Sequence, residues 1–384
     1  MALEEAQLLH DLAFVELTGN VAGAFCAKAL ADTGARVIKV EPPRGHPQRS
    51  DSAPEPGDTE TSRSIFEWLN TGKESVAIDT RHPDGVALLG RLLENADGAI
   101  VDERTQELYA LPDVATLAEQ HPHLVVAALS PFGATGPHAD WLSDDIIQYA
   151  MTCWMHMTGT PDREPLASGG DLANTIPGLA AASGVLMAIH ERKSSGKGQV
   201  VDIAQQDVLA LFQPYTSLSY SYTGMERART GMPFPMTIVP AADGYLGINV
   251  LTQVQWETLC AFAGMVDLLE DPEYADPLAR AAHAQELTDR FAAWAADKTR
   301  AEIVEEAQGW RIPLGYVPTP DETRNLKQHE ARDFFQTVRS SDGAELMMPG
   351  VPFRIDEPIR VRRAPAVNEQ GDAIARDLDE RHGS

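Results

Sequence analysis

The strongest constraint on the fold is an alternation of short apolar runs with helix-like segments in the first third of the chain. The apolar runs lie at residues 11–17, 35–41, 75–79, 98–101 and 123–129, and helix-like segments lie between them at 22–32 and 83–95. Strands that alternate with helices at this spacing predict a parallel sheet with helices on both faces. The sequence therefore predicts an α/β fold with an open, doubly wound, Rossmann-like sheet, in which ligands bind at the carboxyl ends of the strands.

The rest of the chain suggests a second domain. Residues 42–63 contain almost no large apolar groups and are expected to form a loop. Residues 177–191 are apolar nearly all round, which predicts a buried helix, and residues 199–203 predict another strand. From residue 214 an irregular stretch runs to 239, followed by a short strand at 244–250 and charged helices to 308.

We therefore expect three segments. Residues 1–213 form the amino-terminal part of a large α/β domain, and residues 214–330 form a smaller α/β domain. Residues 331–384 have extended character and end in an acidic helix.

The net charge of −26 excludes some classes of partner. It argues against a nucleic-acid ligand and against an anionic membrane surface, since both need clustered cations. No apolar run approaches 18 residues, and the acidic amino terminus lacks the basic region of a signal peptide. Cys26, Cys153 and Cys260 are widely spaced, so neither a disulfide framework nor a metal site is expected. The expected location is the cytoplasm.

Several segments, taken together and in order, resemble the family III CoA-transferases, also called the CaiB/BaiF family. They include residues 34–42 (GARVIKVEP), 69–75 (LNTGKES), 130–137 (SPFGATGP), 145–150 (DIIQYA), 184–188 (GVLMA), 196–202 (GKGQVVD) and 363–365 (RAP). The resemblance implies an enzyme that exchanges coenzyme A between an acyl-CoA and a carboxylic acid. It also implies that residues 331–384 return to the large domain, and that two protomers form an intertwined dimer.

In this family an aspartate carboxylate carries the acyl group. The resemblance places it ten residues before Gly184 and five after Gly169, and both spacings point to Asn174. A carboxamide is a poor nucleophile, because its nitrogen lone pair is delocalised and its oxygen is uncharged. The nearest carboxylate is Asp171, displaced by about 4.5 Å along a helix axis. Asp171 is thus either the nucleophile or the N-cap of a helix.

The candidates for binding coenzyme A are also residues that the resemblance suggests. Lys73 and Asn70 belong to the matched Asn-x-x-Lys motif, and Arg44 and Arg104 are cations that could meet phosphates. Glu103 stands where the family has an asparagine near coenzyme A.

Four functions are compatible with these residues. The chain is a self-sufficient transferase that uses Asp171, or a nucleophile-lacking subunit that works with a paralogous subunit, as in benzylsuccinyl-CoA transferase-like heteromers. Alternatively it is an acyl-CoA racemase, although racemases place a histidine where Ser143 stands, or a non-catalytic CoA-binding protein. The carboxamide of Asn174 and the acidic Glu103 favour the nucleophile-lacking subunit over the self-sufficient enzyme. Homodimers and heteromers both remain open.

Overall fold

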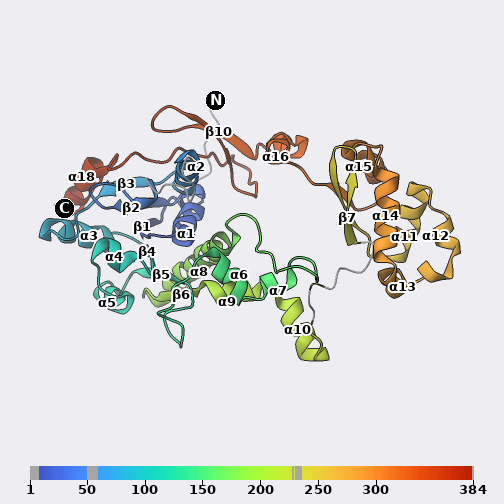
Figure 1. Cartoon of the computed structure of the whole chain (residues 1–384). Helices are drawn as coiled ribbons and strands as arrows, with labels where there is room; N and C mark the ends of the chain where they lie inside the picture. The colour runs from blue at the N-terminus through green and yellow to red at the C-terminus, as the bar shows by residue number, and fades with distance from the viewer. Residues whose placement is uncertain (1–7, 50–58, 227–228, 230–235, 383–384) are drawn as a thin grey trace. The chain divides into compact units, whose positions relative to one another are not determined.

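Figure 1 shows the computed structural model of the chain, which describes residues 8–49, 59–226, 229 and 236–382. The chain divides into two compact units. The larger unit takes residues up to 159, residues 164–228 and residues from 331 onward, and the smaller unit takes residues 160–163 and 229–330. The larger unit therefore contains segments from both ends of the chain.

The larger unit is built on a six-stranded, wholly parallel sheet with the order β3-β2-β1-β4-β5-β6. Its strands are β1 (Ala13–Leu17), β2 (Arg36–Glu41), β3 (Glu74–Ala77), β4 (Gly98–Asp102), β5 (Val125–Ser130) and β6 (Val200–Ala204). This order, with a reversal between β1 and β4, is that of a doubly wound sheet. The predicted fold class is confirmed.

Helices cover both faces of the sheet because successive residues of each strand point to opposite sides. In β5, Val125 and Ala127 pack on the face covered by α1 (Val21–Asp32) and α8 (Leu172–Ser195). Val126 and Ala128 pack on the other face. The helices on that second face are α3 (Pro83–Glu94), α4 (Thr105–Tyr109), α5 (Val114–Gln120) and α18 (Gly371–His382). Since α18 lies on this face, the carboxyl-terminal segment returns to the larger unit (Figure 1).

Helix α8 is the core helix of this unit. Among the described residues it alone has the length and hydropathy of a helix that could cross a membrane. Ala181, Val185 and Ile189 are nevertheless buried in the cluster that α8 forms with α1 and the sheet. Gly178 allows the close approach, because a Cβ there would lie 2.5 Å from the carbonyl oxygen of Ala22.

Several elements differ from the prediction, and one of them is β7 (Met236–Ala241), which begins inside the stretch expected to be irregular. Helix α2 (Thr59–Leu69) begins inside the expected loop 42–63, because Phe66 and Leu69 lie one turn apart and are both buried. A short 3₁₀ turn, Pro47–Arg49, also lies there, and residues 50–58 are outside the described residues. Helix α10 (Pro214–Thr223) occupies a stretch expected to be irregular. The buried helix predicted at 177–191 begins at Leu172.

The reason for missing α10 is its composition. Eight of its ten residues are Ser, Thr or Tyr, which have low helix propensity. Its ends carry the usual signals instead. Pro214 opens the first turn, and Gly224 closes the last one with a φ of +64°.

The larger unit contains further short elements between and after the sheet strands. They are α6 (Asp145–Met151), α7 (Trp154–Met157), α9 (Gln205–Leu211), and the hairpin of β10 (Phe335–Arg339) and β11 (Glu345–Pro349). Helix α17 (Lys327–Ala331) belongs to the smaller unit except for its last residue. Helix α6 packs against α8 and places its side chains near the start of that helix.

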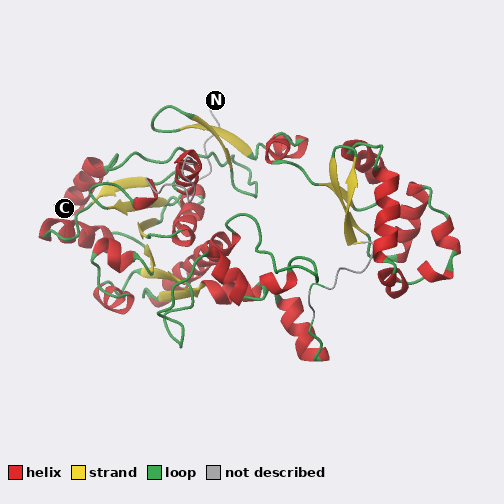
Figure 2. Cartoon of the chain, viewed as in Figure 1, coloured by secondary structure: helices red, strands yellow, loops and turns green. Residues whose placement is uncertain are grey.

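The smaller unit has its own core. An antiparallel sheet of β7 (Met236–Ala241), β8 (Gly244–Asn249) and β9 (Leu314–Tyr316) packs against helices, as Figure 2 shows. The helices of this unit are α11 (Gln253–Ala263), α12 (Asp267–Glu270), α13 (Pro277–Ala282), α14 (Ala284–Ala295), α15 (Arg300–Gly309) and α16 (Pro320–Arg324), with a 3₁₀ turn at Pro272–Tyr274. Capping boxes at Thr252 and Thr299 set the starts of α11 and α15.

Candidate active site

The start of α8 brings both candidate acyl carriers together. Asp171 occupies the N-cap position, but its side chain accepts no hydrogen bond from the first helical N–H groups. Its backbone carbonyl instead accepts hydrogen bonds from the N–H and the hydroxyl of Thr175. The carboxylate of Asp171 therefore does not cap the helix.

Asn174 holds this carboxylate directly. Its Nδ2 donates a hydrogen bond to Oδ1 of Asp171 at 2.6 Å. Both side chains are half-buried. The carboxyl group of Asp171 thus lies one hydrogen bond away from the side chain at the position that the resemblance assigns to the acyl carrier. The positive end of the α8 dipole favours negative charge at this place.

Two residues of α6 complete the cluster, and sequence reasoning did not include them among the candidates. Tyr149 is fully buried, and its hydroxyl accepts a hydrogen bond from the N–H of Ala173 at 3.2 Å. Burial, followed by the charge of Asp171, raises the pKa of Asp145 to about 6. Burial and then Asp145 also raise the pKa of Tyr149. The sequence could have revealed both residues through the matched segment 145–150. In this segment Asp145 and Tyr149 are four residues apart and therefore lie on one helix face.

The carboxyl end of β4 carries the next group of candidates. Oδ2 of Asp102 accepts hydrogen bonds from the N–H groups of Gly19 (2.6 Å) and Asn20 (2.8 Å) at the start of α1. Burial and then Glu103 nevertheless raise the pKa of Asp102 to about 7. Glu103 is exposed and accepts from Nδ2 of Asn20 at 2.9 Å. A carboxylate therefore already occupies the anion-binding N–H groups of this turn.

A cavity of about 380 Å³ opens beside these residues, at the carboxyl ends of β4 and β5. Its ionisable lining residues are all acidic: Asp102, Glu103, Asp113 and Asp202. This lining is apolar and acidic, and it suits an uncharged portion of a ligand better than a phosphate.

Lys73 and Asn70 lie in the core rather than at a surface. Nζ of Lys73 contacts Glu16 at 2.7 Å and donates to Oδ1 of Asn70 at 3.1 Å. Lys39 forms a second ion pair with Glu16 at 2.7 Å. Burial alone would raise the pKa of Glu16, but the two ammonium groups lower it to about 2. Burial lowers the pKa of Lys73 to about 8, an effect that Glu16 partly offsets.

Lys73 and Asn70 are buried in this arrangement and take part in its ion-pair and hydrogen-bond network, and their contact with coenzyme A stays a prediction. Sequence reasoning could not foresee this, because Glu16 lies far away along the chain. Of the proposed cations, Arg44 is exposed on the turn after β2, and Arg104 is exposed with its Nε 3.8 Å from Glu107. These two remain accessible to a phosphate. No group of three metal-ligating side chains occurs among the described residues.

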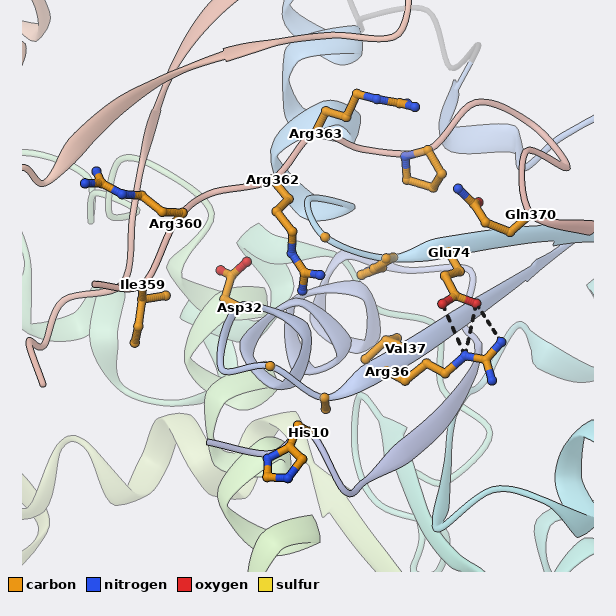
Figure 3. Close-up of a pocket in the computed structure, with 15 residues that line it drawn as sticks. His10, Asp32, Arg36, Val37, Glu74, Ile359, Arg360, Arg362, Arg363 and Gln370 are labelled. Carbon is orange, nitrogen blue, oxygen red and sulfur yellow. Dashed lines mark hydrogen bonds and ion pairs between the residues drawn. The ribbon is translucent and has the colours of Figure 1, made fainter. Parts of the chain in front are cut away.

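A larger cavity, of about 420 Å³, lies at the opposite edge of the sheet, where β2 and β3 begin (Figure 3). Arg362 points into it, whereas Arg360 and Arg363 point away and Arg36 is bound to Glu74. Its place at the amino ends of the strands sets it apart from the ligand-binding edge.

Comparison with known proteins shows the family to which this chain belongs. The structure superposes on that of a CaiB/BaiF family protein from Brucella suis with a TM-score of 0.86, at 29% identity and over 98% of this chain and 100% of the other. The profile of CoA-transferase family III matches residues 9–371. The chain belongs to CoA-transferase family III, as the resemblance implied.

Two curated relatives are similar over nearly their whole lengths. Succinyl-CoA–D-citramalate CoA-transferase of Chloroflexus aurantiacus is 34% identical over 366 residues, which is 90% of this chain and 87% of that protein. Succinate–glutarate CoA-transferase of Agrobacterium fabrum is 30% identical over 385 residues, 97% of this chain and 96% of that protein. Both names describe the movement of CoA between carboxylic acids, and CoA-transferase activity is thereby supported here.

Proposed function

We propose that this chain transfers coenzyme A from an acyl-CoA to a carboxylic acid, and that the carboxylate of Asp171 carries the acyl group. The observation that supports this most is the hydrogen bond of 2.6 Å from Asn174 to Asp171. The side chain of Asp171 does not cap α8, and it lies one hydrogen bond from the position that the resemblance assigns to the acyl carrier.

The chemistry follows from covalent catalysis, in which one difficult exchange is divided into easier steps. An oxygen of Asp171 attacks the thioester carbonyl, the C–S bond breaks, and a mixed anhydride and CoA thiolate result. The thiolate then attacks the aspartyl carbonyl and releases the donor acid. The acceptor carboxylate reverses both steps. In this scheme Asn174 orients one oxygen of Asp171 and leaves the other to react.

The relatives suggest the class of substrate. Their names include succinate, glutarate and citramalate, which are all acids with two carboxyl groups. We propose one dicarboxylic acid as acceptor and the CoA thioester of a different dicarboxylic acid as donor. Arg44 and Arg104, both exposed, are the cations proposed to meet the phosphates of CoA.

A second candidate is the nucleophile-lacking subunit of a heteromeric transferase. The carboxamide of Asn174 at the expected position favours it, and so does the acidic lining near Glu103, which repels a polyanion. In this case a paralogous chain supplies the aspartate.

One experiment separates the two candidates. The purified chain is incubated with succinyl-CoA and a panel of other short acyl-CoA donors, hydroxylamine is added, and mass spectrometry locates any hydroxamate. The first proposal expects the label at Asp171 in the wild type and none in Asp171→Ala. The second expects no label until Asn174→Asp restores a carboxylate, or until the chain is co-expressed with an aspartate-bearing paralogue. The absence of a hydroxamate from every sample, on this chain and on the paralogue alike, would reject both.

We also propose an intertwined dimer, which the family resemblance implies. Large apolar side chains are exposed on α9, on α10 and between them, namely Leu211, Phe212, Tyr215, Leu218, Tyr220 and Tyr222. Large exposed apolar side chains gathered on two consecutive helices favour an interaction site. Cytoplasmic location also remains a prediction.

A further inference from the structure

Asp145 lies at the candidate active site, and its side chain does not cap α6, the helix that it begins. The side chain of Asp144, not that of Asp145, caps α6, by accepting a hydrogen bond from the N–H of Asp145 at 2.8 Å. Oδ1 of Asp145 is buried and has no hydrogen-bond partner among the described residues. A buried, unpaired carboxylate oxygen is costly and calls for an explanation.

Asp145 and Asp171 both lie where α6 packs against the start of α8. The charge of Asp171 raises the pKa of Asp145, whereas the N–H of Ala173 lowers it. Tyr149, one turn along α6, binds the same N–H through its hydroxyl and fixes α6 against the start of α8. Two carboxyl groups are thereby held together, with Asn174 donating to one of them.

Among the described residues, the strongest charged influences on Asp145 are anionic. The charged groups that act on Asp145 are Asp171 and Asp144, and both raise its pKa. Helices α7 and α9 also pack against α6. The ionisable side chain of α7 is His156, which lies 3.3 Å from Glu226, and that of α9 is the exposed Asp207.

We propose that Asp145 is a positioning residue that primes Asp171 for acylation, because the repulsion between the two carboxylates is relieved when Asp171 becomes acylated. The inference rests on the proposed role of Asp171. As Asp171 attacks, a C–O bond forms, the C–S bond breaks, and the electron pair leaves on sulfur. Asp171 passes from an anion to a neutral anhydride, and no proton is transferred. Only one negative charge then remains at the pair.

The proposal has a definite pH dependence. The raised pKa of Asp145, about 6, means that the pair holds one proton below this pH and two full charges above it. Repulsion, and with it the priming of Asp171, is therefore lost as the pH falls through about 6. Asp145→Asn cannot ionise and should remove this dependence.

The test is the rate at which Asp171 forms a covalent adduct with succinyl-CoA between pH 5 and pH 8. Mass spectrometry of the protein follows the adduct without hydroxylamine, because hydroxylamine itself titrates in this range. In the wild type the rate should rise about tenfold or more across pH 6, since each pKa unit corresponds to a factor of ten. Asp145→Asn should label slowly and with a flat profile over the same range. Asp145→Glu should recover part of the rise, and Asp207→Asn, a matched control on α9, should behave as the wild type.

The outcomes are distinct. Labelling of the wild type with an unchanged profile in Asp145→Asn overturns the priming role and leaves the role of Asp171 standing. No labelling of the wild type overturns both. If circular dichroism shows that Asp145→Asn is misfolded, the wild type and Asp145→Glu still test the proposal. The absence of a rise across pH 6 in both of these proteins would reject it.

Discussion

Glu16 is the residue on which the buried charge of the large sheet depends. It has no exposed surface and balances two equally buried ammonium groups, Lys39 and Lys73. Ion pairs of this depth contribute little net stability, but the loss of one partner leaves an uncompensated charge in the core. Lys73 is therefore part of the scaffold under the ligand-binding edge, and its contact with coenzyme A stays a prediction.

We predict that Glu16→Gln lowers the free energy of unfolding by about 3–5 kcal/mol, because it strands two buried cations. Guanidinium unfolding followed by circular dichroism measures this change. Glu107→Gln is the control, since it alters an exposed pair at 3.8 Å and should cost under about 1 kcal/mol. An equal effect of the two substitutions would show that the network is not a structural element.

The same residue sets a pH dependence of stability. The pKa of Glu16 is about 2 in the folded chain, below the value of about 4.3 expected when unfolded. A lowered carboxyl pKa stabilises the folded chain above the unfolded value. This stabilisation is complete at neutral pH and is lost as the pH falls from about 4 toward 2.

At the scale of elements, the contact of α1 with α8 determines where the active site lies. Asp171 and Asn174 lie at the start of α8. Gly178, four residues after Asn174, is where α8 packs closely against Ala22 of α1. A shift of α8 would thus move both site residues. Gly90, in the middle of α3, has no such constraint, because a Cβ there would have no heavy atom within 4 Å.

These two glycines make a matched pair of substitutions. Gly178→Ala should destabilise the fold by about 1–3 kcal/mol, because the added methyl group overlaps backbone and forces the helices apart. Gly90→Ala should stabilise it by about 0.5–1 kcal/mol, through helix propensity alone. Thermal unfolding of both variants checks the signs. A stabilised Gly178→Ala would mean that α1 and α8 are not in such close contact.

At the scale of the whole molecule, the exposed apolar side chains on α9 and α10 support the proposed dimer. The chain's charge of −26 gives general repulsion between molecules, so association must rely on a specific apolar surface. Linked protomers cannot separate as folded bodies, and their interface should exceed the ~1,600 Å² of a standard complex.

We predict that the chain sediments as a dimer at nanomolar concentration, and that denaturant dissociates and unfolds it in one transition. Analytical ultracentrifugation and a denaturant series at two protein concentrations test this. Tyr215→Ser combined with Leu218→Ser, on the exposed face of α10, should weaken assembly. A compact, stable monomer in the wild type would contradict the proposal.

The sequence by itself determined the α/β class, the parallel sheet and the family. Strand and helix patterns report burial along a few neighbouring residues, and the segments 69–75, 145–150 and 196–202 occur in family order. It also identified Asp171 and Asn174 as the two residues to compare. Where a helix consists mostly of residues with low helix propensity, as in α10, the same patterns did not reveal it.

Only the tertiary structure decided how the side chains are used. Lys73 lies in a sequence motif that suggests a phosphate ligand, but in the folded chain it is buried in an ion pair with Glu16. Asp171 has the sequence of an N-cap, but the approach of α6 to α8 brings it to Asp145 instead. In both cases the deciding partner is distant in the chain, and burial and charge act through space rather than along the sequence.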